Sequence, residues 1–188
     1  MSIPSFKLPL GGRTAALSAP RKPNRRWLCL WIGALSTAVM TAEPTPTQLK
    51  QYTITDRQTR LTWLRCSVGQ RWNGFRCIGA PRMLTWEQAN EAAAMAKKEL
   101  GGNWRLPTVE ELQTLVCDPC APPKIDQRLF PDTPAAPFWS ASSAPLSVGR
   151  VWTVNFYTGH LFGRNTKSME RYVRLVKAAP AKTVKPSN

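Results

Sequence analysis

Acidic and histidine side chains are scarce in this sequence of 188 residues. Against 26 lysines and arginines stand 11 aspartates and glutamates and a single histidine, His160. General acid–base catalysis and calcium binding both need such groups in clusters, and no serine or cysteine can be paired with His160 from the sequence. His160 follows Thr158-Gly159, a turn signal, so we expect it at the tip of a solvated turn. The sequence therefore predicts a protein that is not an enzyme and that holds neither a metal ion nor a cofactor.

The sequence also lacks an apolar run long enough to cross a bilayer, which takes about 20 residues. Residues 27–40 form a run of 14, after a basic leader and before several small residues. That order is typical of a secretory signal, with cleavage between Ala42 and Glu43, and retention as an uncleaved anchor is the alternative. We predict a signal peptide over 1–42, a proline-containing linker over 43–51, and export to the periplasm, the cell surface or the medium, with membrane contact only through export.

The chain that follows the leader is strongly basic. Without residues 1–42 it holds 20 basic and 11 acidic residues, a formal charge of +9. Such a charge favours anionic partners, for example acidic polysaccharide or lipid headgroups, although it also serves solubility alone. The basic residues are scattered, no motif of a nucleic-acid reader is present, and export argues against such a partner. We therefore expect that the protein does not bind nucleic acid.

Four cysteines follow the leader, an even number that is typical of two disulfides in an exported chain. The sequence allows three pairings, of which we favour Cys66–Cys77, around a glycine-containing loop, and Cys117–Cys120. Cys117 and Cys120 could instead form a redox dithiol, but a reactive thiolate belongs at a helix N-terminus, and Cys117 follows the apolar pattern of a helix that is ending. A zinc site would need two closely spaced pairs, and only one pair is closely spaced.

Two helices are predicted in the middle of the chain. Thr85 with Gln88, and Thr108 with Glu111, are capping boxes, in which each side chain satisfies a backbone N–H group of the new helix. The first helix ends at Gly101, because glycine fits a left-handed cap, and the second runs from residue 108 to about 117. The inward faces should carry Trp86, Ala89, Ala93, Ala96 and Leu100 in the first helix and Val109, Leu112, Leu115 and Val116 in the second.

The link between the helices holds two large apolar side chains, Trp104 and Leu106, in a stretch too short to hide them unless the core lies beneath. We expect both to be buried, and Arg105 between them to hydrogen-bond loop carbonyl groups. We assign a structural rather than a ligand-binding role to ten residues of the domain. They are Trp63, Trp86, Trp104, Arg105, Leu106, Pro107, Thr108, Glu111, Trp139 and Trp152.

Strand signals lie on both sides of the helices. β-Branched and aromatic residues mark strands at 52–54, 61–64, 138–142 and 172–176, and residues 151–163 are predicted to form a hairpin. A strand near each end, two central helices and a later irregular sheet indicate an α+β domain rather than a doubly wound one.

Alternation within these strands predicts which side chains face water. In the hairpin, Trp152, Val154 and Phe156 should be buried, and the polar residues between them, such as Thr153, should lie on the solvent face. In the closing strand, Arg174 is expected to face water.

The rest of the chain carries turn and loop signals. Residues 66–82 are expected to form a loop stapled by its cysteines. Residues 118–137 contain six prolines and predict a long irregular loop, in which Asp126 and Asp132 bond the backbone. Residues 178–188 are predicted to be a disordered tail.

Several short motifs occur in a fixed order, and this order resembles that of the Lcl C-terminal domain family, which is found in bacterial exported proteins. The resemblance covers residues 52–177. The motifs are Asp56-x3-Arg60-Leu61-Thr62-Trp63, Thr85-Trp86-x2-Ala89, Trp104-Arg105-Leu106-Pro107-Thr108-x2-Glu111-Leu112, Ile125-Asp126-x3-Phe130-Pro131-x-Thr133-Pro134, Phe138-Trp139-Ser140-Ala141-Ser142 and Tyr172-Val173-Arg174-Leu175-Val176.

The resemblance implies a C-type-lectin-like fold, in which the terminal strands pair, two helices pack on a mostly antiparallel sheet, and a long irregular loop region follows. The family takes its name from a collagen-like adhesin whose terminal domain is associated with binding sulfated glycans. This chain departs from the family at Arg60, where glycine is usual, and at Asn103, where aspartate is common. It shows no collagen-like repeat, and it lacks the Glu-Pro-Asn and Trp-Asn-Asp motifs by which calcium-dependent lectins coordinate metal and sugar.

Our first hypothesis is an exported or envelope-associated recognition module, adhesive in role, for an anionic or sulfated glycan or another cell-surface ligand. Arginine and lysine would meet sulfate or carboxylate groups, and Tyr157 would offer a flat apolar surface to a sugar ring. The alternative is a structural accessory protein of the envelope or of a pilus-like assembly that binds a protein partner. The sequence does not specify an oligomeric state. The candidate ligand contacts are Arg150, Asn155, Tyr157, His160, Arg164, Lys167 and Arg171.

Overall fold

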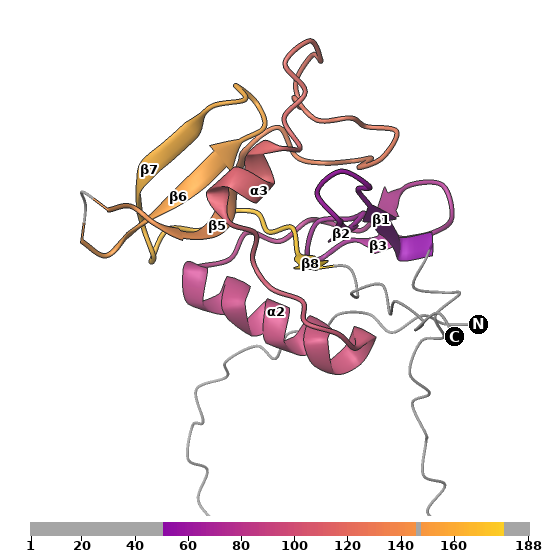
Figure 1. Cartoon of the computed structure of the whole chain (residues 1–188), viewed down its shortest axis with the longest axis horizontal. Helices are drawn as coiled ribbons and strands as arrows, with labels where there is room; N and C mark the ends of the chain where they lie inside the picture. Colours follow the sequence, from indigo (N-terminus) through magenta and orange to yellow (C-terminus); the bar gives the residue numbers. More distant parts are fainter. Residues whose placement is uncertain (1–50, 146–147, 179–188) are drawn as a thin grey trace, which may run out of the picture. The chain divides into compact units, whose positions relative to one another are not determined.

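The computed structural model describes residues 51–145 and 148–178 and is drawn in Figure 1. The predicted signal peptide over 1–42, nearly all of the linker over 43–51, and the tail beyond residue 178 lie outside the described residues. Within the described part, helices α2 and α3 and three antiparallel sheets make an α+β fold. No helix in that part is long and apolar enough to cross a membrane.

The first sheet joins the two ends of the described chain. Trp63 lies opposite Ile54 in one antiparallel pair and opposite Val176 in the other. The predicted pairing of the terminal strands is therefore confirmed, and Ala178, which we had placed in the tail, belongs to the last strand. In spatial order, the strands are β1 (Thr53–Thr55), β2 (Leu61–Leu64) and β8 (Val176–Ala178).

The closing strand is shorter than predicted. We expected it over 172–176, but β8 begins at Val176. The residues before it run beside the chain that follows β2, where the carbonyls of Val173 and Leu175 accept backbone hydrogen bonds from Val68 and Leu64. Residues 173–176 are all buried, so this segment has no face in water.

Arg174 is fully buried, and the prediction that it faces water was wrong. Its Nη1 donates hydrogen bonds to the carbonyls of Leu64, at 2.9 Å, and of Arg65. Its Nη2 donates to the hydroxyl of Thr133 at 2.7 Å. Strand alternation places side chains correctly only when one face is wet, and here both faces are covered. Burial lowers the pKa of Arg174 to about 9, which leaves the guanidinium protonated at neutral pH.

The second sheet contains the predicted hairpin. α3 packs on β5 and β6, and beneath it the rings of Phe138 and Phe156 meet edge to face with centroids 5.1 Å apart. Both rings are fully buried in the main core cluster. The strands, in spatial order, are β5 (Pro137–Ser143), β6 (Arg150–Asn155) and β7 (Leu161–Thr166).

Strand β6 is covered on both faces. Val154 and Phe156 are fully buried and Trp152 is partly buried, as the alternation predicted. Thr153 is fully buried as well, so the prediction of a solvent face there was wrong. Thr153 lies opposite Trp139 of β5, and Trp139 is itself buried and donates its indole N–H to the carbonyl of Leu84. The segment around Leu84 thus covers the face that we expected to be wet.

A small hairpin that the sequence did not predict interrupts the loop over 66–82. Its strands β3 (Arg71–Trp72) and β4 (Cys77–Ile78) are antiparallel. The Cys66–Cys77 disulfide closes the loop that contains it, and the second bridge joins Cys117 to Cys120. Both predicted pairings are confirmed.

Both helices begin at their predicted capping boxes. α2 (Trp86–Leu100) follows Thr85, and α3 (Val109–Gln113) follows Thr108. α3 is shorter than the predicted helix to about residue 117. The hydroxyl of Thr114 donates to a carbonyl of the helix, and Val116 forms a bridge with Ile125 instead of a further turn.

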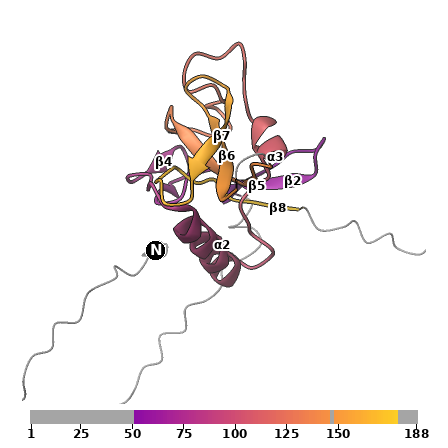
Figure 2. The same cartoon turned by 90° about the vertical axis from the view of Figure 1, so that its left-hand side faces the viewer.

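Helix α2 packs through alanines. Ala89, Ala93 and Ala96 are buried as predicted, and so is Ala92, whereas the two ends of the predicted stripe are only partly buried. Small side chains let the helix approach its neighbours closely. Figures 1 and 2 both show α2 on the side of β8 away from α3.

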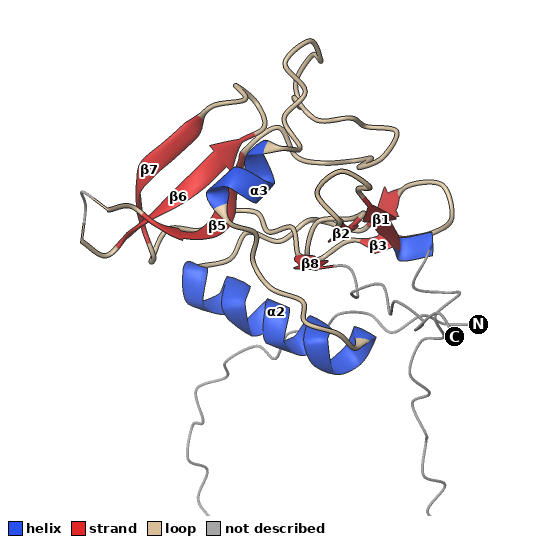
Figure 3. Ribbon diagram, in the orientation of Figure 1, coloured by secondary structure: helices blue, strands red, loops and turns tan. Residues whose placement is uncertain are grey.

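The segment between α3 and β5 is almost all loop, as Figure 3 shows. Two carboxylates hold it. Asp126 accepts a hydrogen bond from the backbone N–H of Arg128 at 2.9 Å, and Asp132 accepts one from the backbone N–H of Cys77 at 3.0 Å. The prediction that these aspartates bond the backbone is confirmed, and Asp132 also ties the loop to the stapled hairpin.

The link between the helices is pinned to β8 and to α3. Trp104 and Leu106 are buried, and the Lys177 ammonium lies 4.5 Å from the centre of the Trp104 ring. Arg105 donates to the carbonyl of Leu106, as expected. Its guanidinium also forms two hydrogen bonds of 2.7 Å with the carboxylate of Glu111. The hydrogen bonds from Arg105 hold the pKa of Glu111 below its ordinary value of 4.5.

Replacement of Glu111 by glutamine should make stability less sensitive to acid. A carboxylate with a lowered pKa stabilises the fold above its unfolded pKa, and this contribution is lost as the pH falls through the lowered folded value. We expect Glu111→Gln to reduce the free energy of unfolding by about 1 kcal/mol at pH 7 and by much less at pH 3. Urea unfolding of both proteins at the two pH values measures this; an equal loss at both pH values would contradict it.

Candidate functional site

The seven candidate contacts do not form one cluster. Strand pairing sets Arg150 opposite Thr166, and Val154 opposite Leu161, so the two ends of the β6–β7 hairpin are separate places. Three candidates lie at the turn and four at the other end. The turn group is Asn155, Tyr157 and His160, and the group at the other end, which we call the basic end, is Arg150, Arg164, Lys167 and Arg171.

The turn group is held by local hydrogen bonds. Asn155 accepts the backbone N–H of Tyr157 at 2.9 Å, and the hydroxyl of Thr158 accepts that of His160 at 3.2 Å. Gly159 has a φ of +78°, and a Cβ there would come within 3.2 Å of Val116. The ring of Tyr157 is 58% exposed. The turn thus offers one free aromatic ring.

The basic end is built by three successive parts of the chain. Arg150 opens β6 and donates from Nη1 to the carbonyl of Arg164 on β7 at 2.7 Å. Lys167 follows β7, and its ammonium lies 4.2 Å from the centre of the Trp86 ring at the start of α2. Such cation–π contacts fix the position of an ammonium while leaving it charged.

Arg171 is committed to contacts within the protein. It donates from Nη2 and Nε to the amide oxygen of Asn165, at 3.0 and 3.2 Å, and from Nη1 to the carbonyl of Glu170. Asn165 is buried and in turn donates to Thr153 at 3.0 Å. Arg171 therefore supports the basic end from beneath, whereas Arg164 is exposed.

The cations of the basic end are not neutralised by ion pairs within the described residues. Three ion pairs occur there, Arg76–Asp132, Arg105–Glu111 and Arg128–Asp126, and each lies elsewhere. The nearest carboxylate in sequence, Glu170, is exposed and joins none of them. The basic end can therefore accept sulfate, carboxylate or phosphate groups from a ligand.

The groups that catalysis would use are dispersed. His160 is exposed at the turn, and the described residues hold no cluster of three His, Cys, Asp or Glu side chains that could bind a metal ion. A shallow hollow of about 500 Å³ lies beside the second disulfide. Its lining includes Cys117 and Cys120, which are bonded to each other, and therefore offer no thiolate.

Sequence reasoning missed the exposed tip of the stapled hairpin. Residues 57–86 contain six arginines and no Asp, Glu or Lys, and this segment carries the stapled hairpin. The run of arginines without any carboxylate was the available signal. Phe75, at the hairpin tip, is 89% exposed.

The fold and the basic end define a small disulfide-bonded α+β domain with a cationic surface that no ion pair among the described residues neutralises. Two disulfides are typical of proteins that mature outside the reducing cytoplasm. The model of the Lcl C-terminal domain matches residues 52–177, about two thirds of the chain. The chain belongs to the Lcl C-terminal domain family, which confirms the resemblance given by the motifs. No curated protein matches the chain.

Proposed function

We propose that this protein is an exported, non-catalytic recognition module that binds an anionic glycan, sulfated or carboxylated, through its basic end. The scaffold would be C-type-lectin-like, as the family implies, and the role adhesive. The observation that carries the proposal is the group of Arg150, Arg164 and Lys167, which comes from three successive segments and has no carboxylate partner among the described residues.

The chemistry of these side chains suits a polyanion. A guanidinium presents a planar fork of N–H donors that matches the oxygens of sulfate or carboxylate. Arg150 is already oriented by its bond to the β7 backbone, and Lys167 by the Trp86 ring, so less side-chain entropy is lost when a ligand binds. Tyr157 and His160 lie at the opposite end of the hairpin and are left out of the proposed site.

Neutralisation of Arg164 and Lys167 tests the proposal. The double variant Arg164→Gln/Lys167→Gln should bind heparin, used as a sulfated glycan probe, about tenfold more weakly and with a smaller dependence on salt, because two charge contacts are lost. Binding is measured by titration calorimetry over a salt series. The matched control is Lys97→Gln/Lys98→Gln, which removes the same charge from exposed positions on α2.

Equal weakening by both double variants would mean that only net charge matters, and it would contradict the proposed site. Binding of the Arg164→Gln/Lys167→Gln variant with wild-type affinity would do the same. If the protein instead captured one stoichiometric envelope protein without competition from glycan, the structural accessory role would be favoured.

A further inference from the structure

The stapled hairpin is a rigid projection. The amide oxygen of Asn73 accepts the backbone N–H groups of Phe75, at 3.0 Å, and of Arg76, at 2.9 Å, which closes the turn. Gly74 has a φ of +106° and nothing within 4 Å of the place where a Cβ would be. The Cys66–Cys77 disulfide holds the base of the hairpin. The tip is thus ordered and clear of the rest of the domain.

The hairpin is also anchored to the loop before β5. Arg65 lies 4.6 Å over the ring of Trp72 and donates to the carbonyl of Leu129 at 3.2 Å. Arg76 forms a 2.6 Å ion pair with Asp132, which also accepts the N–H of Cys77. These contacts fix the direction in which the tip points.

The tip presents one apolar ring among arginines. Phe75 is 89% exposed, more than any other aromatic side chain in the described part of the chain. Arg71 is exposed, and no ion pair neutralises it there. Phe75 thus lies four residues beyond an exposed arginine that no carboxylate neutralises in the described part of the chain, and such a charge favours an anionic partner.

We propose that this hairpin docks the protein on an anionic lipid bilayer, with Phe75 inserted at the interface and Arg71 against lipid phosphates. This proposal replaces the expectation that the protein contacts a membrane only through export. A protein partner usually covers about 800 Å² with an apolar centre and polar rim, whereas Phe75 is a single ring on a narrow two-stranded tip. A bilayer can bind a tip of this size, because the ring enters the interfacial zone while arginine reaches the headgroups.

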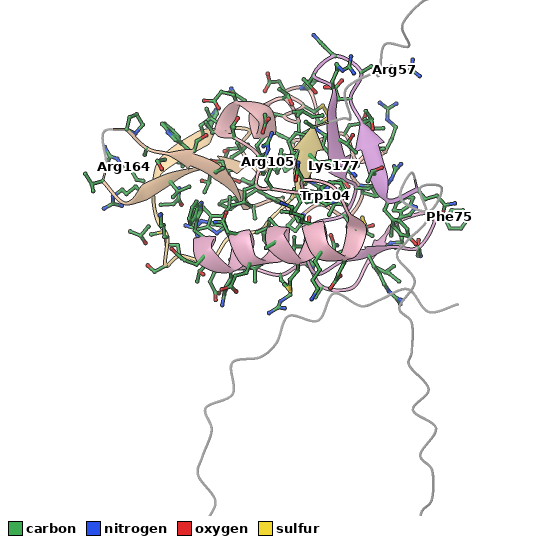
Figure 4. All side chains as sticks on the ribbon, turned by 60° about the horizontal axis from the view of Figure 1, so that its bottom comes forward. Arg57, Phe75, Trp104, Arg105, Arg164 and Lys177 are labelled. Carbon is green, nitrogen blue, oxygen red and sulfur yellow. A yellow bond between two sulfur atoms is a disulfide. The ribbon has the colours of Figure 1, made fainter. Side chains whose placement is uncertain are left out.

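This surface is separate from the proposed glycan site. Figure 4 shows Phe75 and Arg164 at opposite ends of the domain. Docking through the hairpin would leave the basic end free, so the module could hold a membrane at one end and a glycan at the other. The two proposals stand on different residues and fail independently.

Sedimentation with vesicles tests the docking. The chain as recovered from the cell, with its N-terminus determined, is mixed with vesicles of phosphatidylcholine and phosphatidylglycerol (3:1) or of phosphatidylcholine alone. Phe75→Ala should lower the partition coefficient for the anionic vesicles about tenfold, since burial of a phenyl ring is lost. Arg71→Gln should lower it about fivefold on anionic vesicles only. Phe162→Ala, which removes a half-exposed ring from β7, is the matched control and should change nothing.

A second readout locates the ring. Phe75→Trp should gain fluorescence that lipids brominated on the acyl chains quench, beyond the quenching of the wild type. The proposal is overturned if the wild type stays in the supernatant, if Phe75→Ala partitions like the wild type, if Phe162→Ala loses as much, or if the fluorescence gained in Phe75→Trp is not quenched. Unchanged thermal unfolding of each variant shows that the fold is kept.

Discussion

Replacement of Arg174 by methionine is expected to lower the free energy of unfolding by about 3–5 kcal/mol, because several buried hydrogen-bond acceptors lose their donor. Arg174 joins three segments that are distant in sequence: its own, the chain after β2, and the loop before β5. It is fully buried. Its loss would remove a single side chain that hydrogen-bonds both of the other segments.

The physical reason lies in the acceptors that would remain. The carbonyls of Leu64 and Arg65 and the hydroxyl of Thr133 would lose a buried donor, and unsatisfied buried groups each cost about 1–3 kcal/mol. The guanidinium also lies 4.8 Å from the centre of the Phe130 ring. Methionine would keep the van der Waals contact with this ring and lose the cation–π attraction.

Urea unfolding measures this effect, with Arg164→Met as the matched control. Arg164 is exposed, so its replacement should change the free energy of unfolding by no more than about 0.5 kcal/mol. The free energy of unfolding of Arg174→Lys should fall between those of the wild type and Arg174→Met, because lysine keeps the charge and loses the planar set of N–H donors. A loss below about 1 kcal/mol in Arg174→Met, less than one unsatisfied buried group costs, would show that the guanidinium does not hold these segments together.

Replacement of Cys66 and Cys77 by serine should lower the free energy of unfolding by about 3 kcal/mol, because the bridge restricts the unfolded chain. The bridge spans 11 positions, and the loss of entropy that it imposes on the unfolded chain grows with loop length. The matched variant Cys117→Ser/Cys120→Ser removes a bridge that spans only 3 positions, and its loss should be about 1 kcal/mol smaller.

Chemical denaturation of both double variants measures the difference. The order of the two losses is the informative result, because both variants make the same chemical change. A larger loss in Cys117→Ser/Cys120→Ser would contradict the argument that the bridge spanning more positions stabilises the fold more.

Local signals predicted much of this fold. The capping boxes at Thr85 and Thr108 depend on side chains within one helical turn, and the disulfide pairs close short loops. The predictions failed where segments distant in sequence determine whether a side chain is buried. Thr153 and Arg174 were assigned to wet faces because alternation assumes one, and segments remote in sequence cover both positions.

The candidate site was predicted only in part for a similar reason. Residues near one another along a hairpin were treated as one group, but six strand residues rise about 20 Å, so Asn155 and Arg150 mark different ends of β6. The stapled hairpin was missed because two-residue strands carry no usable periodicity. The exposure of Phe75 likewise depends on a tip geometry that one short sequence segment does not specify.

The most direct test of the recognition proposal is nuclear magnetic resonance mapping with a sulfated heparin oligosaccharide. Backbone resonances of residues 150 and 164–167, and the indole resonance of Trp86, should shift in a saturable and salt-dependent way, and they should not shift in Arg164→Gln/Lys167→Gln. Shifts confined to the turn around Tyr157 or to the hairpin at Phe75, or no saturable shift at all, would contradict it.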